Sequence, residues 1–348
     1  MKNLPLYNMG AKLTLLTGAL IFLSGCTLFR TATPEEVGSY ESYAGSELVR
    51  DKLKESFDSI KRIHSSVLYN TFVLKPEVQS TVEELRGRNF HELAEHTITD
   101  DHSTAGTAIV IGNRAGRTTM ITASHTVTFP DTIWHYRRNQ QSDQEPIVEG
   151  VSVRYSVYHF LFREDGIMNF ELALNDERRD LALLVHRWDD DNSPDFTPLS
   201  VSPGNSERLD WGDLVYALGY PRGVQMMTRG IVSMTSISPR RSFVVDASFN
   251  RGFSGGALFT VMPDGSGIEW VGILSAAYGE TEYFLTPGSM TERDFNPDIE
   301  YDGPIYMQRA NRINYGIAYA VGIDEIGAFF RENRSEIRRA GLTVPSVP

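Results

Sequence analysis

One serine of the sequence lies in a setting suited to covalent chemistry. Residues 251–257 read Arg-Gly-Phe-Ser-Gly-Gly-Ala, so that Ser254 is surrounded by glycines. A serine attacks a carbonyl group only when a base removes its proton and hydrogen-bond donors stabilise the oxyanion that forms. Glycines let the backbone turn sharply and bring free N–H groups close to the reacting atoms. The segment therefore indicates an acyl-transfer nucleophile at Ser254.

The positions of the histidines limit which kind of hydrolase this serine could serve. The segment also fits the Gly-x-Ser-x-Gly turn of α/β-hydrolases, in which the catalytic histidine follows the serine in the chain. All histidines of this sequence precede Ser254; they are His64, His91, His96, His102, His125, His135, His159 and His186. An α/β-hydrolase is therefore excluded. Two chain orders remain, namely histidine, aspartate, serine or aspartate, histidine, serine.

His125 and Asp180 have the sequence contexts that a base and its partner need. His125 ends an apolar run and follows Ala123 and Ser124, whose small side chains would let an imidazole face a cleft. An isolated histidine at a strand end is usually structural, but the pairing with Ser254 favours a catalytic base. Asp180 begins the apolar run 181–185, where it could accept the imidazole Nδ1–H. The alternative for Asp180 is a pairing with a neighbouring arginine or a turn cap.

Taken in order, these segments resemble the trypsin-like serine proteases, and among them the bacterial HtrA (Deg) branch. The resemblance rests on residues 121–125, 180–184, 217–223 with 228–233, 246–258 and 315–321. It implies an all-β fold of two six-stranded, chymotrypsin-like β-barrels with the site between them. His125 and Asp180 would come from the first barrel and Ser254 from the second.

The resemblance also implies roles for neighbouring residues. The backbone N–H groups of Gly252 and Ser254 would form the oxyanion hole, and Ser248 would lie at the base of the specificity pocket. The segment Ser275, Ala276 and Ala277 would pair with the substrate backbone as an added strand. Phe253 departs from the family, because chymotrypsin relatives carry aspartate there and HtrA proteins commonly carry asparagine. It would pack the oxyanion loop, either in the active shape or flipped out of it.

The N-terminus reads as an export signal. Lys2 and Lys12 precede a short apolar stretch, and Leu-Ser-Gly-Cys at 23–26 resembles the lipobox of bacterial lipoproteins. We therefore expect a lipoprotein signal at 1–25 and a lipid on Cys26, the only cysteine. Loss of the two lysines moves the formal charge from −12 to −14 and leaves 348 − 25 = 323 residues. Such a charge disfavours nucleic acid and leaves the lipid as the membrane tether.

The rest of the chain divides by composition. We expect a linker and a helix over 26–66, a first barrel over 67–198, a second barrel with a closing helix over 199–336, and a tail over 337–348. The first helix is predicted from Ser46, its N-cap, to Ile63, and the closing helix from Asp324 to Arg334. Expected strands are 106–111, 118–122, 151–157, 181–185, 214–218, 230–234, 243–245, 257–261, 270–274 and 315–321.

Two polar segments read as insertions. Residues 136–149 are expected to form a surface loop, and 278–312 either a lid or specificity loop or a solvated excursion. The 18 residues after Phe330 are too few for a PDZ domain.

The sequence thus favours a serine endopeptidase of the bacterial cell envelope that cleaves exported proteins, without cofactor or metal. It would be anchored on the periplasmic face, and Thr27 after the lipidated cysteine fits sorting to the outer membrane by resemblance. The partners would be a protein or peptide substrate and the membrane; the oligomeric state is open. The alternative is an inactive pseudoprotease, a membrane-anchored binding module with a collapsed oxyanion loop.

Overall fold

The computed structural model describes residues 46–137, 145–189, 196–238, 241–287 and 305–348. The expected signal, Cys26 and most of the linker lie outside these ranges, as do the middle parts of the two expected insertions. The described residues belong to one compact unit, 44–348. No helix in these ranges is both long and apolar enough to cross a membrane.

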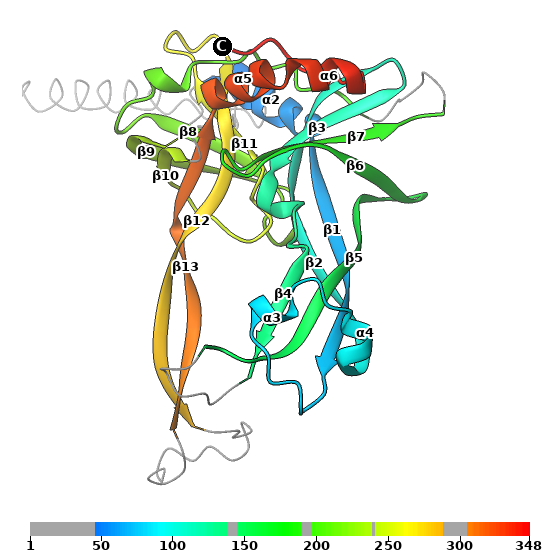
Figure 1. Ribbon diagram of the computed structural model, residues 1–348. Coiled ribbons are helices and arrows are strands. Elements are labelled where there is room, and N and C mark those ends of the chain that lie inside the picture. The colour runs from blue at the N-terminus through cyan, green and yellow to red at the C-terminus, as the bar shows by residue number, and fades with distance from the viewer. Residues whose placement is uncertain (1–45, 138–144, 190–195, 239–240, 288–304) are drawn as a thin grey trace, which may run out of the picture. The chain divides into compact units, whose positions relative to one another are not determined.

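The first barrel is a ring of antiparallel strands. Its strands are β1 (Ile60–Leu74), β2 (Ala94–Arg114), β3 (Arg117–Ala123), β4 (Thr132–Tyr136), β5 (Val148–Arg163), β6 (Gly166–Asp176) and β7 (Leu181–Arg187). The order is β1-β2-β3-β7-β6-β5, and β1 also pairs with β5, which closes the ring (Figure 1). β4 pairs with the outer edge of β5. Apolar side chains such as Ile63, Val110 and Leu184 fill the interior.

The second barrel is closed in the order β10-β13-β12-β11-β8-β9. Its strands are β8 (Leu214–Gly219), β9 (Met226–Ser238), β10 (Arg241–Asp246), β11 (Ala257–Val261), β12 (Ile268–Pro287) and β13 (Ile305–Gly322). β12 and β13 continue past the barrel as a two-stranded ribbon. The described part of the expected 278–312 insertion is therefore paired strand and not an irregular loop. Phe243, Leu258 and Leu274 lie in the barrel core.

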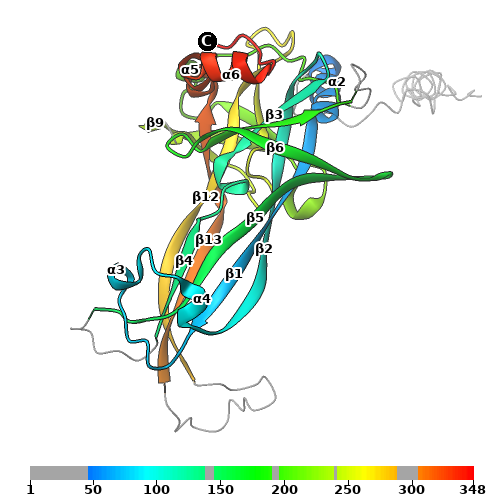
Figure 2. The ribbon, with the colours of Figure 1, turned by 45° about the vertical axis from the view of Figure 1, so that its right-hand side comes forward.

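Three helices cover one end of the barrels, namely α2 (Glu47–Glu55), α5 (Ile323–Glu332) and α6 (Arg334–Ala340) (Figure 2). Their apolar faces share one buried cluster with both barrels; Leu53 and Phe329 pack there with Ile121 of the first barrel and Phe259 of the second. The remaining short helices are η1 (Ser56–Ser59), α3 (Val82–Leu85), α4 (Phe90–Leu93), η2 (Ser124–Thr126), η3 (Ser206–Arg208) and η4 (Pro221–Gly223). The cluster joins the two barrels on the side of the helices.

Each of the ten expected strands lies within an observed strand, and the closing helix is α5. The expected helix from Ser46 to Ile63 is wrong in its second half. Ser46 does cap α2 by accepting from Val49 N at 3.2 Å, but the helix ends at Glu55 and β1 begins at Ile60. Ile60 is still buried in the cluster that holds Leu53, so the apolar spacing predicted burial and not conformation. At the other end, α6 occupies part of the expected tail.

Candidate active site

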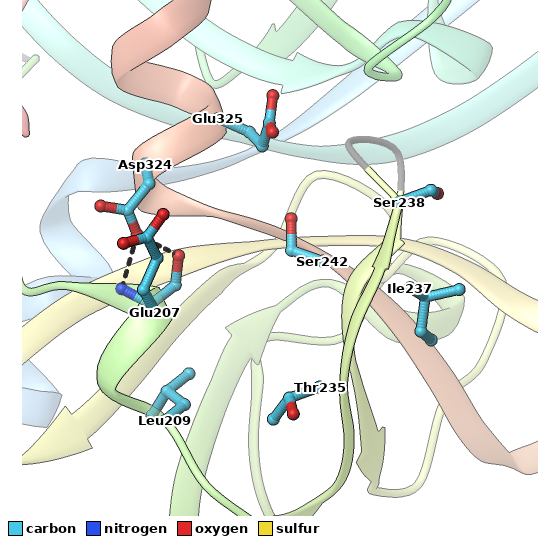
Figure 3. A pocket seen from close by; sticks show the side chains of 9 residues that line it. Glu207, Leu209, Thr235, Ile237, Ser238, Ser242, Asp324 and Glu325 are labelled. Carbon is cyan, nitrogen blue, oxygen red and sulfur yellow. Dashed lines mark hydrogen bonds between the residues drawn. The ribbon is translucent and has the colours of Figure 1, made fainter.

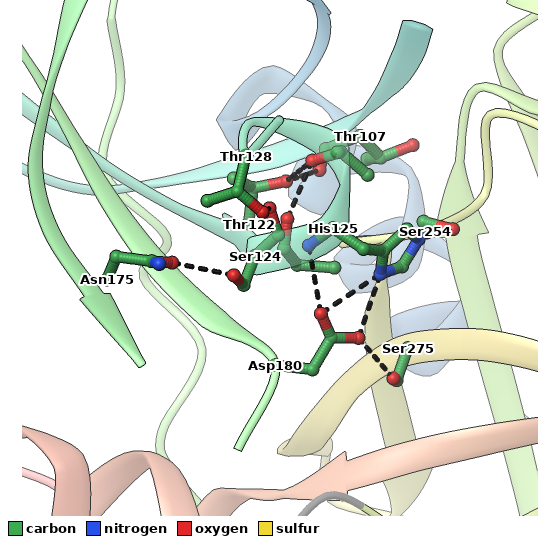
Figure 4. A network of polar contacts seen from close by, with 11 residues as sticks. Thr107, Thr122, Ser124, His125, Thr128, Asn175, Asp180, Ser254 and Ser275 are labelled. Carbon is green, nitrogen blue, oxygen red and sulfur yellow. Dashed lines mark hydrogen bonds and ion pairs between the residues drawn. The ribbon is translucent and has the colours of Figure 1, made fainter. Parts of the chain in front are cut away.

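His125 hydrogen-bonds to the two other residues singled out with it. Its Nε2 lies 2.9 Å from Ser254 Oγ, and its Nδ1 lies 2.9 and 3.0 Å from the two carboxylate oxygens of Asp180 (Figure 4). His125 sits in η2, directly after β3, and Asp180 directly before β7. Because β3 and β7 are paired, with Ala123 opposite Leu181, their ends bring the imidazole and the carboxylate together. Asp180 forms an ion pair with neither of the neighbouring residues Arg178 and Arg179. The structure therefore does not support the alternative role of Asp180 as an arginine partner.

The Asp180 carboxylate is buried and anchored on several sides. It is 1% exposed, and it accepts hydrogen bonds from the backbone N–H of His125 at 3.0 Å and from Ser275 Oγ at 2.5 Å. Its backbone has a positive φ of 60°, which aspartate tolerates better than most residues. Burial raises the pKa of Asp180, but the hydrogen bonds from His125 and Ser275 outweigh it, and the net pKa lies below its ordinary value. The group is therefore a stable anion that can orient the imidazole and stabilise its protonated form.

The loop before Ser254 turns in a defined way. Phe253 N donates to Asn250 O at 3.0 Å, and Gly252 has a φ of +100°. A hydrogen-bonded turn with positive φ at its third residue is of type II. Arg251 O, the carbonyl of the central peptide, accepts from Arg222 N at 2.8 Å. In a trans peptide the N–H points opposite to the C=O, so the Gly252 N–H is directed away from Arg222.

Two N–H groups of this loop are free to bind an anion. Among the described residues, neither the Gly252 N–H nor the Ser254 N–H donates to a hydrogen bond. Both residues border the same pocket as His125. Two unpaired donors beside the serine hydroxyl are the arrangement that a developing oxyanion requires.

The sequence of residues 106–268 matches the family model of the trypsin-like peptidase domain. Over 132 residues the chain is 36% identical to the serine endoprotease DegS of Haemophilus influenzae, a match that covers 35% of this chain and 35% of that protein. The chain thus spans about a third of the length of this curated relative.

Solved structures of the HtrA-type protease AlgW are similar at low identity. The structure with a tripeptide covers 84% of this chain and 64% of its own, at 18% identity and a TM-score of 0.40. The structure with a decapeptide covers 83% and 67%, at 18% identity and a TM-score of 0.41.

Phe253 is part of the core of the second barrel. Its side chain is fully buried in the second barrel, and its ring centroid lies 6.2 Å from that of Phe249. Gly219 makes room for it, because a Cβ at that position would come within 2.8 Å of the ring. In this structure Phe253 thus accompanies a type II turn and not a loop collapsed into the cleft.

Thr107 of β2 holds the loop 250–254, the candidate nucleophile loop, and was not foreseen. Its N–H donates to Ser254 O at 2.7 Å, and its Oγ1 donates to Gly252 O at 2.7 Å while accepting from Tyr220 N at 3.0 Å. Thr122 Oγ1 in turn donates to Thr107 O at 2.7 Å. No motif in the sequence marks Thr107, because Tyr220, Gly252 and Ser254, to which it is bonded, are 113 to 147 positions away in the chain.

The expected substrate segment lies beside the triad. The Ser275 hydroxyl donates a hydrogen bond to Asp180, whereas the backbones of Ala276 and Ala277 pair with Tyr319 and Ala318 of β13. On its other edge, β12 pairs with β11 only as far as Ile273. That edge is therefore open to an added strand from about Ser275 onward. Ser248, the expected base of the specificity pocket, is solvent-exposed in the loop after β10.

The described residues form several pockets, one of them at the candidate site. This pocket has a volume of about 650 Å³ and is bordered by His125, Gly252 and Ser254. Another, of about 280 Å³, lies between β9, β10 and the start of α5, where Asp324 accepts from Ser206 N at 2.7 Å (Figure 3). Among the residues that the structure describes, no cluster of acidic, histidine or cysteine side chains could hold a metal ion.

Proposed function

We propose that the protein is a serine endopeptidase that uses Ser254 as nucleophile, His125 as general base and Asp180 to orient the imidazole. In the first half-reaction, His125 Nε2 takes the Ser254 Oγ proton as Oγ attacks the substrate carbonyl. The same nitrogen then gives that proton to the departing amine. In the second half-reaction, His125 takes a proton from water as the water oxygen attacks the acyl carbon. His125 then gives that proton to Ser254 Oγ as the bond between Oγ and the acyl carbon breaks, which releases the acid and regenerates the serine.

The observation that carries this proposal is the geometry of the nucleophile loop. The turn at 250–253 directs the Arg251 carbonyl towards Arg222, which leaves the N–H groups of Gly252 and Ser254 unpaired beside Ser254 Oγ. Removal of one such donor typically costs about 10²- to 10³-fold in kcat. The similarity of part of the chain to a serine endoprotease supports the same activity.

The alternative function, an inactive binding module, required Phe253 to hold the oxyanion loop collapsed. The buried position of Phe253 beneath a type II turn gives that alternative no support. We therefore retain the enzyme as the proposal and treat the module as an outcome of the test.

The test is covalent labelling of the full-length chain, purified in detergent, with a fluorophosphonate. We expect one adduct, located at Ser254 by mass spectrometry, and its loss in Ser254→Ala and His125→Ala. Ser266→Ala, a change of an exposed turn serine, is the control and should label like the unchanged chain. A folded chain that does not react would reject the enzyme and favour the binding module.

We also propose that the enzyme acts in the cell envelope on exported proteins, tethered by a lipid on Cys26. The proposal depends on the signal-like residues 1–25 and on the cysteine that follows them. Growth of a bacterial expression host with an alkyne analogue of palmitate should label the unchanged chain and not Cys26→Ser. Labelling of both, or of neither, would contradict the tether without affecting the proposed chemistry.

A further inference from the structure

Three arginines border the pocket that contains Ser254. They are Arg62 of β1, Arg222 of η4 and Arg251, the residue before the oxyanion glycine. Among the described residues that line this pocket none is acidic, although the whole chain has a formal charge of −12. A concentration of positive charge in a cleft of an acidic protein attracts anions and orients them.

The three guanidinium groups are available to a ligand. All three residues are exposed, and none forms an ion pair with a residue that the structure describes. By contrast, Arg179 is engaged by three carboxylates. Solvated arginines without partners can exchange water for a carboxylate, which they bind in a bidentate manner.

One side-chain contact and one backbone hydrogen bond place these arginines near one another. The Arg62 guanidinium lies over Gly223, where a Cβ would come within 2.5 Å of its Nη1. Arg222 N donates to Arg251 O, and Arg222 itself has a positive φ of 51°. A non-glycine residue held in this left-handed region is strained, and such strain is concentrated at functional sites. The Arg62 side chain, which starts from β1, therefore ends beside the backbone of Arg222 and Gly223, and Arg222 is hydrogen-bonded to Arg251.

The pocket lies on the leaving-group side of Ser254. It is bordered by Thr126, next to His125, and by Ser103, Thr104 and Ala105 of β2. The segment expected to bind the acyl side of a substrate begins at Ser275 in β12, and Ser275 does not line the pocket. His125 delivers its proton to the leaving amine, so the fragment that departs lies beside His125 and Thr126.

We infer that this pocket binds a carboxylate on the leaving-group side of the scissile bond, so that the enzyme prefers to cut before acidic residues. The inference rests on the proposed function. The carboxylate can belong to an aspartate or glutamate in the first two positions after the bond, or to the free C-terminus of a short leaving fragment. Both present the same planar anion to the arginines.

The test uses synthetic decapeptides and the full-length chain in detergent. Cleavage sites in a decapeptide library are mapped by mass spectrometry, and the cut peptides are then remade in pairs with Glu replaced by Gln, Asp by Asn, or the C-terminal carboxylate by an amide. We expect acidic residues just after the cut bond and a kcat/KM about tenfold lower for the uncharged member, the effect of one charge-assisted hydrogen bond. The replacement that lowers kcat/KM shows whether the carboxylate belongs to a side chain or to the C-terminus.

Arginine variants test whether the pocket causes the preference for charged peptides. Arg62→Gln and Arg251→Gln should each reduce the ratio of kcat/KM between charged and uncharged peptides. Arg88→Gln, a change of an exposed arginine that does not line the pocket, should retain it. High salt should also lower the ratio in the unchanged chain, because these charges are exposed. Cleavage with a ratio near one, or a ratio that both pocket variants leave intact, would overturn the inference while leaving the proposed function in place.

A binding measurement separates the two proposals. Fluorescence anisotropy of labelled decapeptides with the Ser254→Ala chain does not depend on catalysis. Tighter binding of acidic peptides than of their amide partners, lost in Ser254→Ala/Arg251→Gln, supports the carboxylate site even if fluorophosphonate labelling fails. Equal binding of both members of every pair refutes it.

Discussion

Thr107 Oγ1 donates a hydrogen bond to the carbonyl of Gly252 at 2.7 Å, although Thr107 belongs to the first barrel and Gly252 to the nucleophile loop of the second. Together with the bond from Thr107 N to Ser254 O, it holds that loop at two points. The serine hydroxyl and the two free N–H groups therefore keep their positions only while the barrels stay docked.

Thr107→Val should lower the rate of fluorophosphonate labelling at Ser254. Valine keeps the shape but leaves Gly252 O and Tyr220 N without their partner, at a cost of about 1–3 kcal/mol each when buried. Thr107→Ser retains the hydroxyl and should label at nearly the original rate. Equal rates for both variants would show that the hydroxyl does not position the loop.

Gly252→Ala should abolish labelling. Its φ of +100° disfavours any side chain, and a Cβ there would lie 2.4 Å from Tyr220 O, so the turn must change. Gly265→Ala is the matched control, with a φ of +70° and open space around the added methyl. It should lose at most about 1 kcal/mol of stability and no labelling. If both variants label alike, the turn at Gly252 is not needed for the reaction.

Ser275→Ala should slow labelling several-fold without unfolding the protein. The change removes one of the hydrogen bonds that lower the pKa of Asp180, so this pKa should rise. A carboxylate whose pKa is depressed in the folded state stabilises the fold at pH values above its pKa in the unfolded state, 3.8. This contribution is lost as the pH falls through the pKa of the folded state. Urea unfolding at pH 7 and pH 3 should therefore show a smaller loss on acidification for Ser275→Ala than for the unchanged chain.

Arg179→Gln should destabilise the fold by about 1–3 kcal/mol, because it removes a nearly buried cation from three carboxylates. Arg179 is bonded to Asp176, Glu325 and Glu332, at 2.7, 2.8 and 2.5 Å, and so ties α5 to the turn before Asp180. Arg178→Gln is the control, since Arg178 is exposed and reaches only Glu332, at 3.8 Å. Thermal unfolding measures both. A similar change in Tm for the two variants would contradict this role.

Acid should destabilise the first barrel through His159. Burial lowers the pKa of His159 from 6.5 to about 4, and its Nδ1 lies 2.9 Å from Ser65 Oγ. As the pH falls, His159 binds its proton in the unfolded chain before it does so in the folded one. The contribution of His159 to the free energy of unfolding is therefore complete above pH 6.5 and declines between pH 6.5 and about 4. Below pH 4 it changes no further. His159→Gln should remove this component from the urea unfolding curves, whereas exposed His96→Gln should not. An unchanged pH slope in His159→Gln would refute the assignment.

Much of this architecture could be predicted from local patterns. The apolar runs of β3, β7 and β11 are short and bounded by turn residues, and the three candidate triad residues flank such runs. The start of β1 was assigned to a helix because Val49, Leu53, Phe57 and Ile60 have helical spacing, although Ile60 enters the shared core from a strand. β4 and β6 were missed; β6 buries few of its side chains and so lacks a clear apolar run.

The contacts that shape the site could not be predicted in the same way. Thr107 contacts Gly252 across 145 positions of sequence, and Ser275 contacts Asp180 across 95. Such contacts depend on how two barrels dock, and no local periodicity encodes that. The conformation of the loop that contains Phe253 likewise depends on the space that Gly219 leaves for the ring.

The division of the triad between the barrels has a consequence for the timing of activity. His125 and Asp180 are synthesised well before Ser254, and β12 and β13, which close the second barrel, come after it. A nascent chain thus carries either no Ser254 or one without the strands that support it. The proposed endopeptidase would therefore become able to cleave only after its last strand is in place, and an unfinished chain would not cut the machinery that synthesises it.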